Sequence, residues 1–430
     1  MKRVSQKYAV DDLLHTKKQL LQWAQQFREV VFLDSNLHKA RYSSYEAVLA
    51  FDAFTLLQTD YEDGFDKLTA YQSHTRDWLF GYLGYDLKND VEKLSSENFD
   101  GLHFPDLFFF QPKKIIFLKE GTLCFEYLSM CEDEIISDLA EIKATNINGS
   151  YTAGLKIQDR VSFEDYTKGF RTMMDHIKRG DIYEANFCIE FFAEEAEIEP
   201  DAVYWKLNAI SEPPFATFAK FNQHYLMSAS PERYLKKTGT KVVSQPIKGT
   251  AKRGTTQNED EKLKEELFLN EKERSENVMI VDLVRNDLSR TAVKASVQVE
   301  ELFGVYSFKQ VHQMISTVVS AVPENINPVE VIRSTFPMGS MTGAPKHSAM
   351  QIIEKVEKTK RGLYSGAVGY FTPQDDFDFN VIIRSILYHK ASGYVSFSVG
   401  SAITINANEE DEYRECLLKA AAMKKVLEEC

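Results

Sequence analysis

Short apolar runs separated by turn residues fill the first third of the chain. Each run is rich in β-branched and aromatic residues, a composition that is typical of β-strands. We therefore predict strands over residues 30–36, 44–58, 78–87 and 107–128. The last of these segments is predicted to be a hairpin, because the turn residues Glu120-Gly121 divide it into two halves.

From about residue 160 the apolar positions switch between a helical and a strand-like period. Their spacing predicts an amphipathic helix that begins after Ser162, a good N-cap, and ends at Gly180. A second helical pattern runs from Asn258, which with Glu261 resembles a capping box, to about Arg290. The remaining helices are predicted to open at Pro328 and to cover 343–362 and 409–429, and the remaining strands to cover 224–247, 377–389 and 393–405.

This order of elements predicts the fold class. Strands and helices do not alternate as regular βαβ units, so we expect an α+β fold with mostly antiparallel sheets. A polar, turn-rich stretch at 142–159 is the best candidate boundary, and it divides the chain into 1–150 and 151–430.

Charge and composition narrow the classes of partner. A net charge of −13 and a pI of about 5.3 would repel a phosphate backbone, so we do not expect nucleic acid as a partner. The N-terminus lacks the apolar core of a signal peptide, and no apolar run approaches the roughly 18 residues that span a bilayer. The five cysteines form no CxxC pair, which fits reduced thiols better than a zinc site. We expect a cytoplasmic protein that does not bind membranes.

Two pairs of glutamates have a spacing that suits metal binding. Glu273 and Glu276 are three residues apart in one predicted helix, as are Glu412 and Glu415 in another, and residues i and i+3 share a helix face. Two such faces turned toward each other would offer carboxylates to Mg²⁺, which prefers oxygen ligands. The same spacing also fits two solvated acidic surfaces, and spacing alone does not separate these interpretations.

Two other features suit a small anion. The segment 339–346 places the hydroxyls of Ser340 and Thr342 and two glycines before a predicted helix N-terminus, where free N–H groups favour negative charge. Arg384 lies within an apolar predicted strand, where a buried guanidinium would need a carboxylate partner. The alternatives are an ordinary turn with a helix cap, and an arginine that points from an edge strand into water.

Three further residues have suitable chemistry but no distinctive spacing. His312 lies among apolar, β-branched neighbours, and it could exchange a proton near neutral pH or be a hydrogen-bonded core residue. Glu232 ends a predicted strand, and Lys248 lies beside a turn, where a lysine is usually solvated. Taken with the glutamate pairs and the anion-binding features, they suggest a metal-bridged site for a small carboxylated substrate.

A series of longer motifs is much more specific than these spacings. The motifs occur here in the order GDIYEANF, SASPERY, PIKGTAKRG, SENVMIVDLVRNDLSR, FPMGSMTGAPK, YSGAVGYF and DEYREC. This series closely resembles the chorismate-binding enzymes, which include anthranilate, aminodeoxychorismate, isochorismate and salicylate synthases, and the resemblance covers roughly 160–425. It implies one α+β globule with two antiparallel sheets packed crosswise and helices outside, in which 1–150 and 151–430 are intertwined subdomains.

The resemblance also implies a metal site and a substrate site. Glu276 and Glu415 would be the principal Mg²⁺ ligands, with Glu273 and Glu412 beside them, and the metal would hold the ring carboxylate of chorismate. His312 would donate a proton to the leaving C4 hydroxyl. The implied substrate-binding residues are Arg384, Tyr364, Ser340, Thr342 and a glycine-rich turn at Gly400, Ser401 and Ala402.

Lys248 selects a branch within the family. Anthranilate synthases typically read PIAGT at this point, whereas aminodeoxychorismate synthases (component I) resemble PIKGT, the sequence found here. The resemblance implies that the Lys248 amine adds at C2 of chorismate as the C4 hydroxyl leaves, and that ammonia then adds at C4 and displaces the lysine. The product would be 4-amino-4-deoxychorismate, the precursor of p-aminobenzoate and folate. A neutral amine is required, so we expect the surroundings to lower the Lys248 pKa and Glu232 to shuttle its proton.

The same resemblance leaves other functions open. An anthranilate synthase, an isochorismate or salicylate synthase, and a non-catalytic chorismate or amino-acid binding protein would share most of these motifs. FLDSN and YSSYEAVLAFD resemble, more loosely, a segment that forms a tryptophan pocket. Ala402 stands where the family has a glycine. No Gly-x-Cys-x-Gly glutaminase motif is present, so the expected partner is a separate glutaminase that supplies ammonia.

Overall fold

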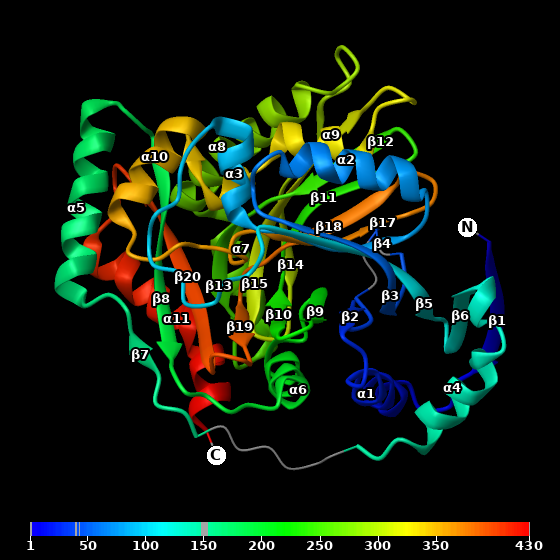
Figure 1. Ribbon diagram of the computed structural model, residues 1–430. Helices are drawn as coiled ribbons and strands as arrows, with labels where there is room; N and C mark the ends of the chain where they lie inside the picture. Colours follow the sequence, from blue (N-terminus) through cyan, green and yellow to red (C-terminus); the bar gives the residue numbers. More distant parts are fainter. Residues whose placement is uncertain (1, 39–40, 43, 148–153, 430) are drawn as a thin grey trace.

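The computed structural model describes residues 2–429 apart from 39–40, 43 and 148–153. Its strands pair antiparallel in a continuous hydrogen-bonded network, in which two sheets share the long strands β3 (Ala47–Thr59) and β5 (Leu107–Lys119) (Figure 1). This arrangement confirms the predicted α+β fold of two antiparallel sheets with helices outside. None of the helices in the described ranges is long and apolar enough to cross a bilayer.

The first sheet contains both β1 and β20. Its strands lie in the order β1 (Arg3–Ala9), β6 (Thr122–Leu128), β5, β3, β2 (Glu29–Asp34), β9 (Phe215–Phe221), β10 (His224–Ser230), β19 (Ser385–His389), β20 (Tyr394–Thr404) and β8 (Glu184–Ala193). The short strands β7 (Gln158–Asp159) and β16 (Gly343–Ala344) pair with β8. Residues of 1–150 thus pair directly with residues of 151–430 where β2 meets β9.

The second sheet begins at the other half of β5. Its strands lie in the order β5, β4 (Leu79–Leu83), β17 (Ala367–Phe371), β18 (Phe377–Val381), β11 (Arg233–Thr238), β12 (Lys241–Gln245) and β15 (Val311–Ala321), and β15 also pairs with β13 (Ile247–Lys252) and β14 (Gln298–Ser307). The two chain regions meet again where β4 pairs with β17. The predicted boundary itself falls on 148–153, outside the described residues, and stays a prediction.

A bend in β3 joins the two sheets. Asp52 has a φ of 58°, and the register between β3 and β5 shifts between Ala53 and Thr55. Before the bend, β3 pairs with β2 in the first sheet. Beyond it, β3 pairs with the half of β5 that also pairs with β4 in the second sheet. The β3–β5 pair therefore passes from one sheet into the other.

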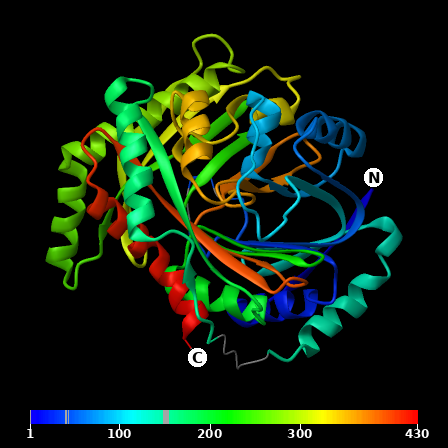
Figure 2. The ribbon, with the colours of Figure 1, turned by 60° about the vertical axis from the view of Figure 1, so that its left-hand side comes forward.

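Strand residues alternate between two hydrophobic cores, as the period of two requires. In β2, Val30 and Phe32 belong to the core under the helices of the first sheet, and Val31 and Leu33 to the core that includes residues of both sheets. The first core holds residues of α1 (Leu13–Ala24), α4 (Glu134–Ala144), α5 (Phe163–Arg179), α6 (Pro200–Ser211), α10 (Lys346–Val356) and α11 (Glu409–Glu428). Figures 1 and 2 show α5 and α11 lying together along β8 and β20.

The remaining helices lie mainly over the second sheet. The second core holds residues of α2 (Gly64–Thr75), α8 (Glu271–Ser289) and α9 (Pro328–Thr335). Helix α7 (Gln257–Leu269) contributes Leu267 to a small separate cluster with Phe303 and Met314. The short helices are α3 (Lys88–Glu92), η1 (Tyr85–Leu87), η2 (Ser129–Cys131) and η3 (Gly339–Met341).

Several local predictions are confirmed. The β5–β6 hairpin turns at Glu120-Gly121, and Lys119 pairs with Thr122. Ser162 caps α5 by accepting a hydrogen bond from the Asp165 N–H at 3.1 Å, and Gly180 ends this helix with a φ of 83°. These features depend on a few neighbouring residues, which is why the sequence reveals them.

Four predicted boundaries are wrong. Residues 377–389 are not one strand, because Arg384 has a φ of 52° and the chain leaves β18 in the second sheet for β19 in the first. The pattern over 258–290 contains two helices, because Asn270 is extended and caps α8. Thr256, not Asn258, caps α7. The helix predicted over 343–362 ends at Val356, since Glu357 is extended.

Candidate active site

Two chain segments cross between the sheets at one place. Glu232 lies in the connection from β10 to β11, and Arg384 lies in the connection from β18 to β19. Backbone hydrogen bonds join these crossovers. The N–H of Val381 donates to the carbonyl of Glu232, and the N–H of Ala229 donates to the carbonyl of Arg384, both at 3.0 Å. The fold thus brings two predicted site residues, far apart in sequence, to the same point.

Lys248 forms a short, buried ion pair. Its Nζ donates to Glu184 Oε1 at 2.6 Å, and the exposed fractions of the two side chains are 12% and 3%. Burial lowers the pKa of Lys248, but the charges of Glu184 and Glu276 outweigh it, and the pKa is raised above its ordinary value. The expectation that the surroundings lower this pKa is therefore wrong, because sequence reasoning did not count the carboxylates around the amine.

Glu184 is the residue that sequence reasoning missed. It opens β8, and no spacing signal connects it with Lys248. The available signal was a carboxylate at the start of the otherwise largely apolar run EANFCIEFFA. Its second oxygen, Oε2, is buried and accepts no hydrogen bond from the described residues. Buried polar atoms are normally paired, so this oxygen is a candidate acceptor for a ligand.

Glu232 is placed to exchange a proton. Its carboxylate is buried and accepts a hydrogen bond from Ser340 Oγ at 2.8 Å. Burial raises the pKa of Glu232 to about 7, although the bond from Ser340 and the charge of Lys248 act in the opposite direction. A carboxyl group that titrates near neutral pH suits acid–base catalysis.

The loop that carries Ser340 is fixed by its own hydrogen bonds and by a buried arginine. The Thr342 hydroxyl donates to the carbonyl of Met338 at 3.1 Å, so it is used within the loop. Arg361, which is also buried, donates to the carbonyls of Met341 and, at 2.8 Å, of Asn186, and it pairs with Glu357 at 2.7 Å. Arg361 therefore ties the Ser340 loop to β8, the strand of Glu184.

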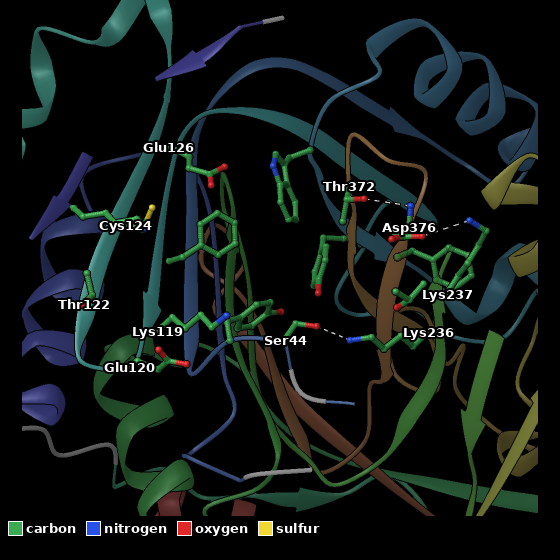
Figure 3. Close-up of a pocket in the computed structure, with 17 residues that line it drawn as sticks. Ser44, Lys119, Glu120, Thr122, Cys124, Glu126, Lys236, Lys237, Thr372 and Asp376 are labelled. Atoms are coloured by element: carbon green, nitrogen blue, oxygen red, sulfur yellow. Dashed lines mark hydrogen bonds and ion pairs between the residues drawn. The ribbon is translucent and has the colours of Figure 1, made fainter. Parts of the chain in front are cut away.

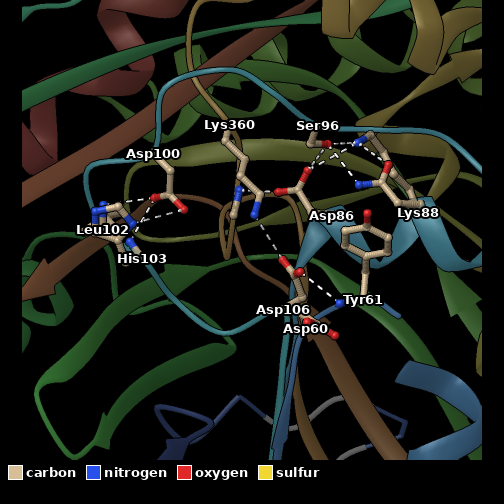
Figure 4. A network of polar contacts seen from close by, with 12 residues as sticks. Asp60, Tyr61, Asp86, Lys88, Ser96, Asp100, Leu102, His103, Asp106 and Lys360 are labelled. Atoms are coloured by element: carbon tan, nitrogen blue, oxygen red, sulfur yellow. Dashed lines mark hydrogen bonds and ion pairs between the residues drawn. The ribbon is translucent and has the colours of Figure 1, made fainter. Parts of the chain in front are cut away.

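A polar network around Asp86 in the N-terminal region holds the backbone at Gly362, between Arg361 and Tyr364 (Figure 4). Asp86 accepts from the backbone N–H of Gly362 at 2.9 Å and from Ser96 Oγ at 2.5 Å, and Lys88 donates to Asp86 at 3.2 Å. The ion pair between Lys360 and Asp106, at 3.4 Å, lies beside them. The FGYLGYDL segment thus fixes the turn that carries Tyr364.

His312 has both ring nitrogens occupied. Nε2 lies 2.9 Å from Asp260 Oδ1, Nδ1 lies 2.9 Å from Ser307 Oγ, and the residue is fully buried. This geometry is that of a hydrogen-bonded core histidine. The role of proton donor to the substrate stays a prediction, and it would require one of these hydrogen bonds to break.

The side chain of Arg384 offers a positive charge to an anion. The Arg384 guanidinium makes no hydrogen bond or ion pair with a described residue, and burial lowers its pKa. Tyr364 and Glu415 are the charged or ionisable groups that act on it most strongly after burial. An unpaired guanidinium next to a tyrosine suits a carboxylate.

Residues 400–402 do not form the predicted glycine-rich turn. They lie within β20 and pair with β8, where Gly400 is opposite Cys188. The Gly400 carbonyl accepts from Lys419 Nζ at 2.7 Å, so it points away from β8. Because the N–H and C=O of one strand residue point to the same side, the N–H groups of Gly400 and Ala402 face this second edge of β20. Ser401 instead faces β8.

A lysine of α8 lies between the two glutamate pairs. Lys272 Nζ lies 3.9 Å from Glu276 Oε1 on α8 and 3.7 Å from Glu412 Oε1 on α11, so it bridges the two helices. Burial raises the pKa values of Glu273, Glu276 and Glu412, that of Glu276 to about 7. The pKa of Glu415 is lowered, because Lys419 pairs with it at 2.7 Å and outweighs its burial.

This cluster has an excess of negative charge. Its five carboxylates, Glu184, Glu273, Glu276, Glu412 and Glu415, surround three ammonium groups, Lys248, Lys272 and Lys419. Among the described residues no three His, Cys, Asp or Glu side chains are close enough together to enclose a metal ion. Mg²⁺ needs only one or two protein carboxylates if water and substrate supply its other ligands. When all of these groups are ionised, the carboxylates outnumber the ammonium groups by two, and this charge and the oxygen donors fit one such ion.

Two cavities lie away from this site. The larger, about 570 Å³, is lined by the aromatic residues Tyr45, Trp78, Phe117 and Tyr370 and by polar residues that include Lys119 and Glu126 (Figure 3). None of the predicted site residues lines it.

The smaller cavity, about 50 Å³, is lined by part of FLDSN and by Arg233 and Asp378, which form an ion pair at 3.0 Å. Ligand pockets usually have roughly 300–1,000 Å³, so the smaller cavity alone is too small for tryptophan, whereas Ser44 and Tyr45 of YSSYEAVLAFD also line the larger one. The tryptophan pocket stays a prediction.

Comparison with known proteins gives consistent results. A profile of the chorismate binding enzyme family matches residues 21–425. The chain is 36% identical over 365 residues to the chloroplastic aminodeoxychorismate synthase of Arabidopsis thaliana. This alignment covers 80% of this chain and 39% of that protein. The chain is 30% identical over 361 residues to aminodeoxychorismate synthase component 1 of Bacillus subtilis, covering 81% and 76%. The chain thus spans about two fifths of the length of the plant relatives it matches.

A solved structure has the same fold. Anthranilate synthase component I from Streptococcus pneumoniae TIGR4 superimposes with a TM-score of 0.79, covering 90% of this chain and 94% of that one, at 24% identity. Similarity at this level supports the architecture described above and not a particular reaction.

Proposed function

This chain belongs to the chorismate binding enzyme family, and we propose that it converts chorismate and ammonia to 4-amino-4-deoxychorismate. The observation that carries the proposal is the buried amine of Lys248, held on Glu184 at the centre of the site and close enough to Glu232 to influence its pKa. Relatives named aminodeoxychorismate synthase, at 36% and 30% identity, support the same reaction.

In the proposed first step the Lys248 nitrogen forms a bond to C2 of chorismate while the C4–O bond breaks and both ring double bonds shift, from C1=C2 and C5=C6 to C1=C6 and C4=C5. The hydroxyl group leaves as water after it takes up a proton. Lys248 must first lose its own proton, and Glu184 Oε1, 2.6 Å away, is the nearest acceptor. Glu232, with its pKa of about 7, would be a second group able to exchange a proton with the Lys248 amine or the leaving hydroxyl.

In the second step ammonia forms a bond to C4, and the C2–N bond to Lys248 breaks. The nitrogen of ammonia remains in the product, and Lys248 regains a proton. The unpaired oxygen Glu184 Oε2 is available to accept a hydrogen bond from the incoming ammonia. A separate glutaminase is the proposed source of ammonia, consistent with the words "component 1" in the name of the Bacillus relative.

The remaining groups would bind the substrate carboxylates. We assign the enolpyruvyl carboxylate to Arg384, to Tyr364 and to the N–H groups at the open edge of β20. Glu276 and Glu415 would hold Mg²⁺, with Glu273 and Glu412 beside them. When bound, Mg²⁺ would supply a positive charge for the ring carboxylate.

The product of the purified chain tests this proposal. The chain is incubated with chorismate, MgCl₂ and ammonium at pH 8, and the product is identified by mass and retention time. We expect 4-amino-4-deoxychorismate. Anthranilate, isochorismate or salicylate as the main product would overturn the proposed branch. Chorismate binding without turnover, even with a glutaminase present, would indicate a binding protein instead.

A further inference from the structure

Lys272 lies where the two acidic helices face each other. Its ammonium group is within 4 Å of one carboxylate on α8 and one on α11. We propose that Lys272 is the resident counter-ion of this cluster and that a divalent cation displaces it on binding. The inference rests on the metal site of the proposed function, but it concerns a residue for which neither the motifs nor the spacing suggested a role.

The three lysines of the cluster are held very differently. Lys248 is 12% exposed and lies 2.6 Å from Glu184. Lys419 lies 2.7 Å from Glu415 and also donates to the Gly400 carbonyl at 2.7 Å. Lys272 is 53% exposed, and its two contacts are longer, at 3.7 and 3.9 Å. Of these three ammonium groups, that of Lys272 can leave for solvent with the least loss of contacts.

Lys272 and a metal ion would compete for the same oxygens. Lys272 approaches Glu276 Oε1 and Glu412 Oε1, and these side chains are 16% and 6% exposed. A divalent ion bound to either oxygen would be a few ångströms from the ammonium group, and like charges at that distance repel strongly. The half-exposed Lys272 side chain relieves this repulsion by turning outward, whereas the carboxylates remain in place.

The exchange explains how the cluster keeps its shape. Without a cation between them, the buried carboxylates of α8 and α11 would repel each other across the helix interface. Lys272 neutralises part of this charge, and it does so weakly enough to be replaced. The same contact that stabilises the metal-free protein therefore lowers its affinity for metal.

The substitution Lys272→Met tests the inference, because it removes the charge and keeps most of the side-chain volume. MgCl₂ alone is titrated into each purified protein, in calorimetry and in thermal unfolding at constant ionic strength. We expect Mg²⁺ to bind Lys272→Met roughly three- to tenfold more tightly than the wild type. We also expect a lower unfolding temperature without Mg²⁺ and a larger increase when Mg²⁺ is added.

Two further variants separate local competition from the change in net charge. Lys262→Met changes the net charge equally, but it removes an exposed pair with Glu266 on α7, so Mg²⁺ affinity should be unchanged. Lys272→Arg keeps the charge and should keep affinity close to that of the wild type. Equal or weaker Mg²⁺ binding by Lys272→Met would overturn the inference, as would equal gains in both methionine variants.

The test does not depend on the reaction. Chorismate and product are absent, so a different product in the assay above would leave the displacement result intact. If neither the wild type nor Lys272→Met bound Mg²⁺ saturably, the inference and the metal assignment would both fall, and the assignment of the amination chemistry to Lys248 would still be judged by its own assay.

Discussion

The amine end and the acidic end of the site are built in opposite ways. Lys248 and Glu184 come from strands of different sheets, are almost fully buried and form one short ion pair. The glutamates of α8 and α11 come from helices, carry more charge than their lysines neutralise, and are bridged by a half-exposed side chain. In the first region the charges are paired without a ligand and only the buried oxygen Glu184 Oε2 is left without a partner among the described residues, whereas the second has the charge of a site that a ligand completes. Substitutions should therefore affect catalysis at one end and binding at the other.

Lys248→Ala should give the largest effect, and it tests the role of the amine end. Removing the nucleophile should lower the rate of aminodeoxychorismate formation by roughly a thousandfold or more. Chorismate binding, measured by calorimetry with Mg²⁺ present, should change by only a few-fold, because the groups assigned to both carboxylates remain. Full activity of this variant would falsify covalent catalysis by Lys248.

Glu276→Gln should give the next largest effect, and it tests the acidic end. We expect Mg²⁺-dependent chorismate binding to weaken by at least roughly 10- to 100-fold, the loss typical when a residue that only supports a metal ligand is removed, because Glu276 is assigned as a ligand itself. Glu271→Gln, an exposed carboxylate in the first turn of the same helix, is the matched control and should leave binding unchanged. An unaltered Mg²⁺ dependence in Glu276→Gln would remove this residue from the metal site.

Glu184→Gln sharpens the comparison by breaking the ion pair but keeping the side-chain shape. Glu184 is the strongest of the charges that raise the Lys248 pKa, and burial opposes it. Without this charge the Lys248 pKa should fall, so the rising limb of the pH–rate profile should move to lower pH by about one unit. Ser340→Ala, which removes a hydrogen bond to Glu232 and not to Lys248, should leave this limb in place. If the rising limb of the pH–rate profile did not move in Glu184→Gln, the ionisation of Lys248 would not control this limb.

The smallest expected effect is on stability, and Glu232→Gln tests it by urea unfolding, apart from any effect of this substitution on the reaction. The pKa of Glu232 is raised from 4.5 to about 7, so between these values the folded chain holds a proton that the unfolded chain releases. The free energy of unfolding of the wild type should therefore fall as pH rises through this window. The variant cannot ionise here, so from pH 4.5 to 8 it should gain on the order of 1 kcal/mol relative to the wild type in urea unfolding. Parallel curves for the two proteins would contradict the raised pKa.

Local features of the fold could be predicted from the sequence because they depend on neighbouring residues. The tip of the β5–β6 hairpin and the caps of α5 are of this kind. The break at Arg384 could not be predicted, because it occurs where the chain changes sheets, and no glycine, proline, asparagine or aspartate lies next to it. The bend at Asp52, where the β3–β5 pair passes from one sheet to the other, likewise depends on the packing of the two sheets and not on neighbouring residues.

The candidate site follows the same division. The i, i+3 spacing marked the two glutamate pairs as candidates, since it is a property of each helix alone, and their role in holding a metal stays a prediction. The partners of these faces could not be read from spacing: Lys272 bridges two helices, and Glu184 lies on a distant strand. Motif resemblance supplied Lys248 and its reaction, but not the carboxylate that holds it or the direction of its pKa shift.

The two crossovers at Glu232 and Arg384 hold the sheets together at one point. Two backbone hydrogen bonds join one crossover to the other, so the sheets cannot separate here unless both bonds break. We therefore expect the frame that carries Glu232 and Arg384 to stay closed, so that any rearrangement on ligand binding would be confined to side chains such as the half-exposed Lys272.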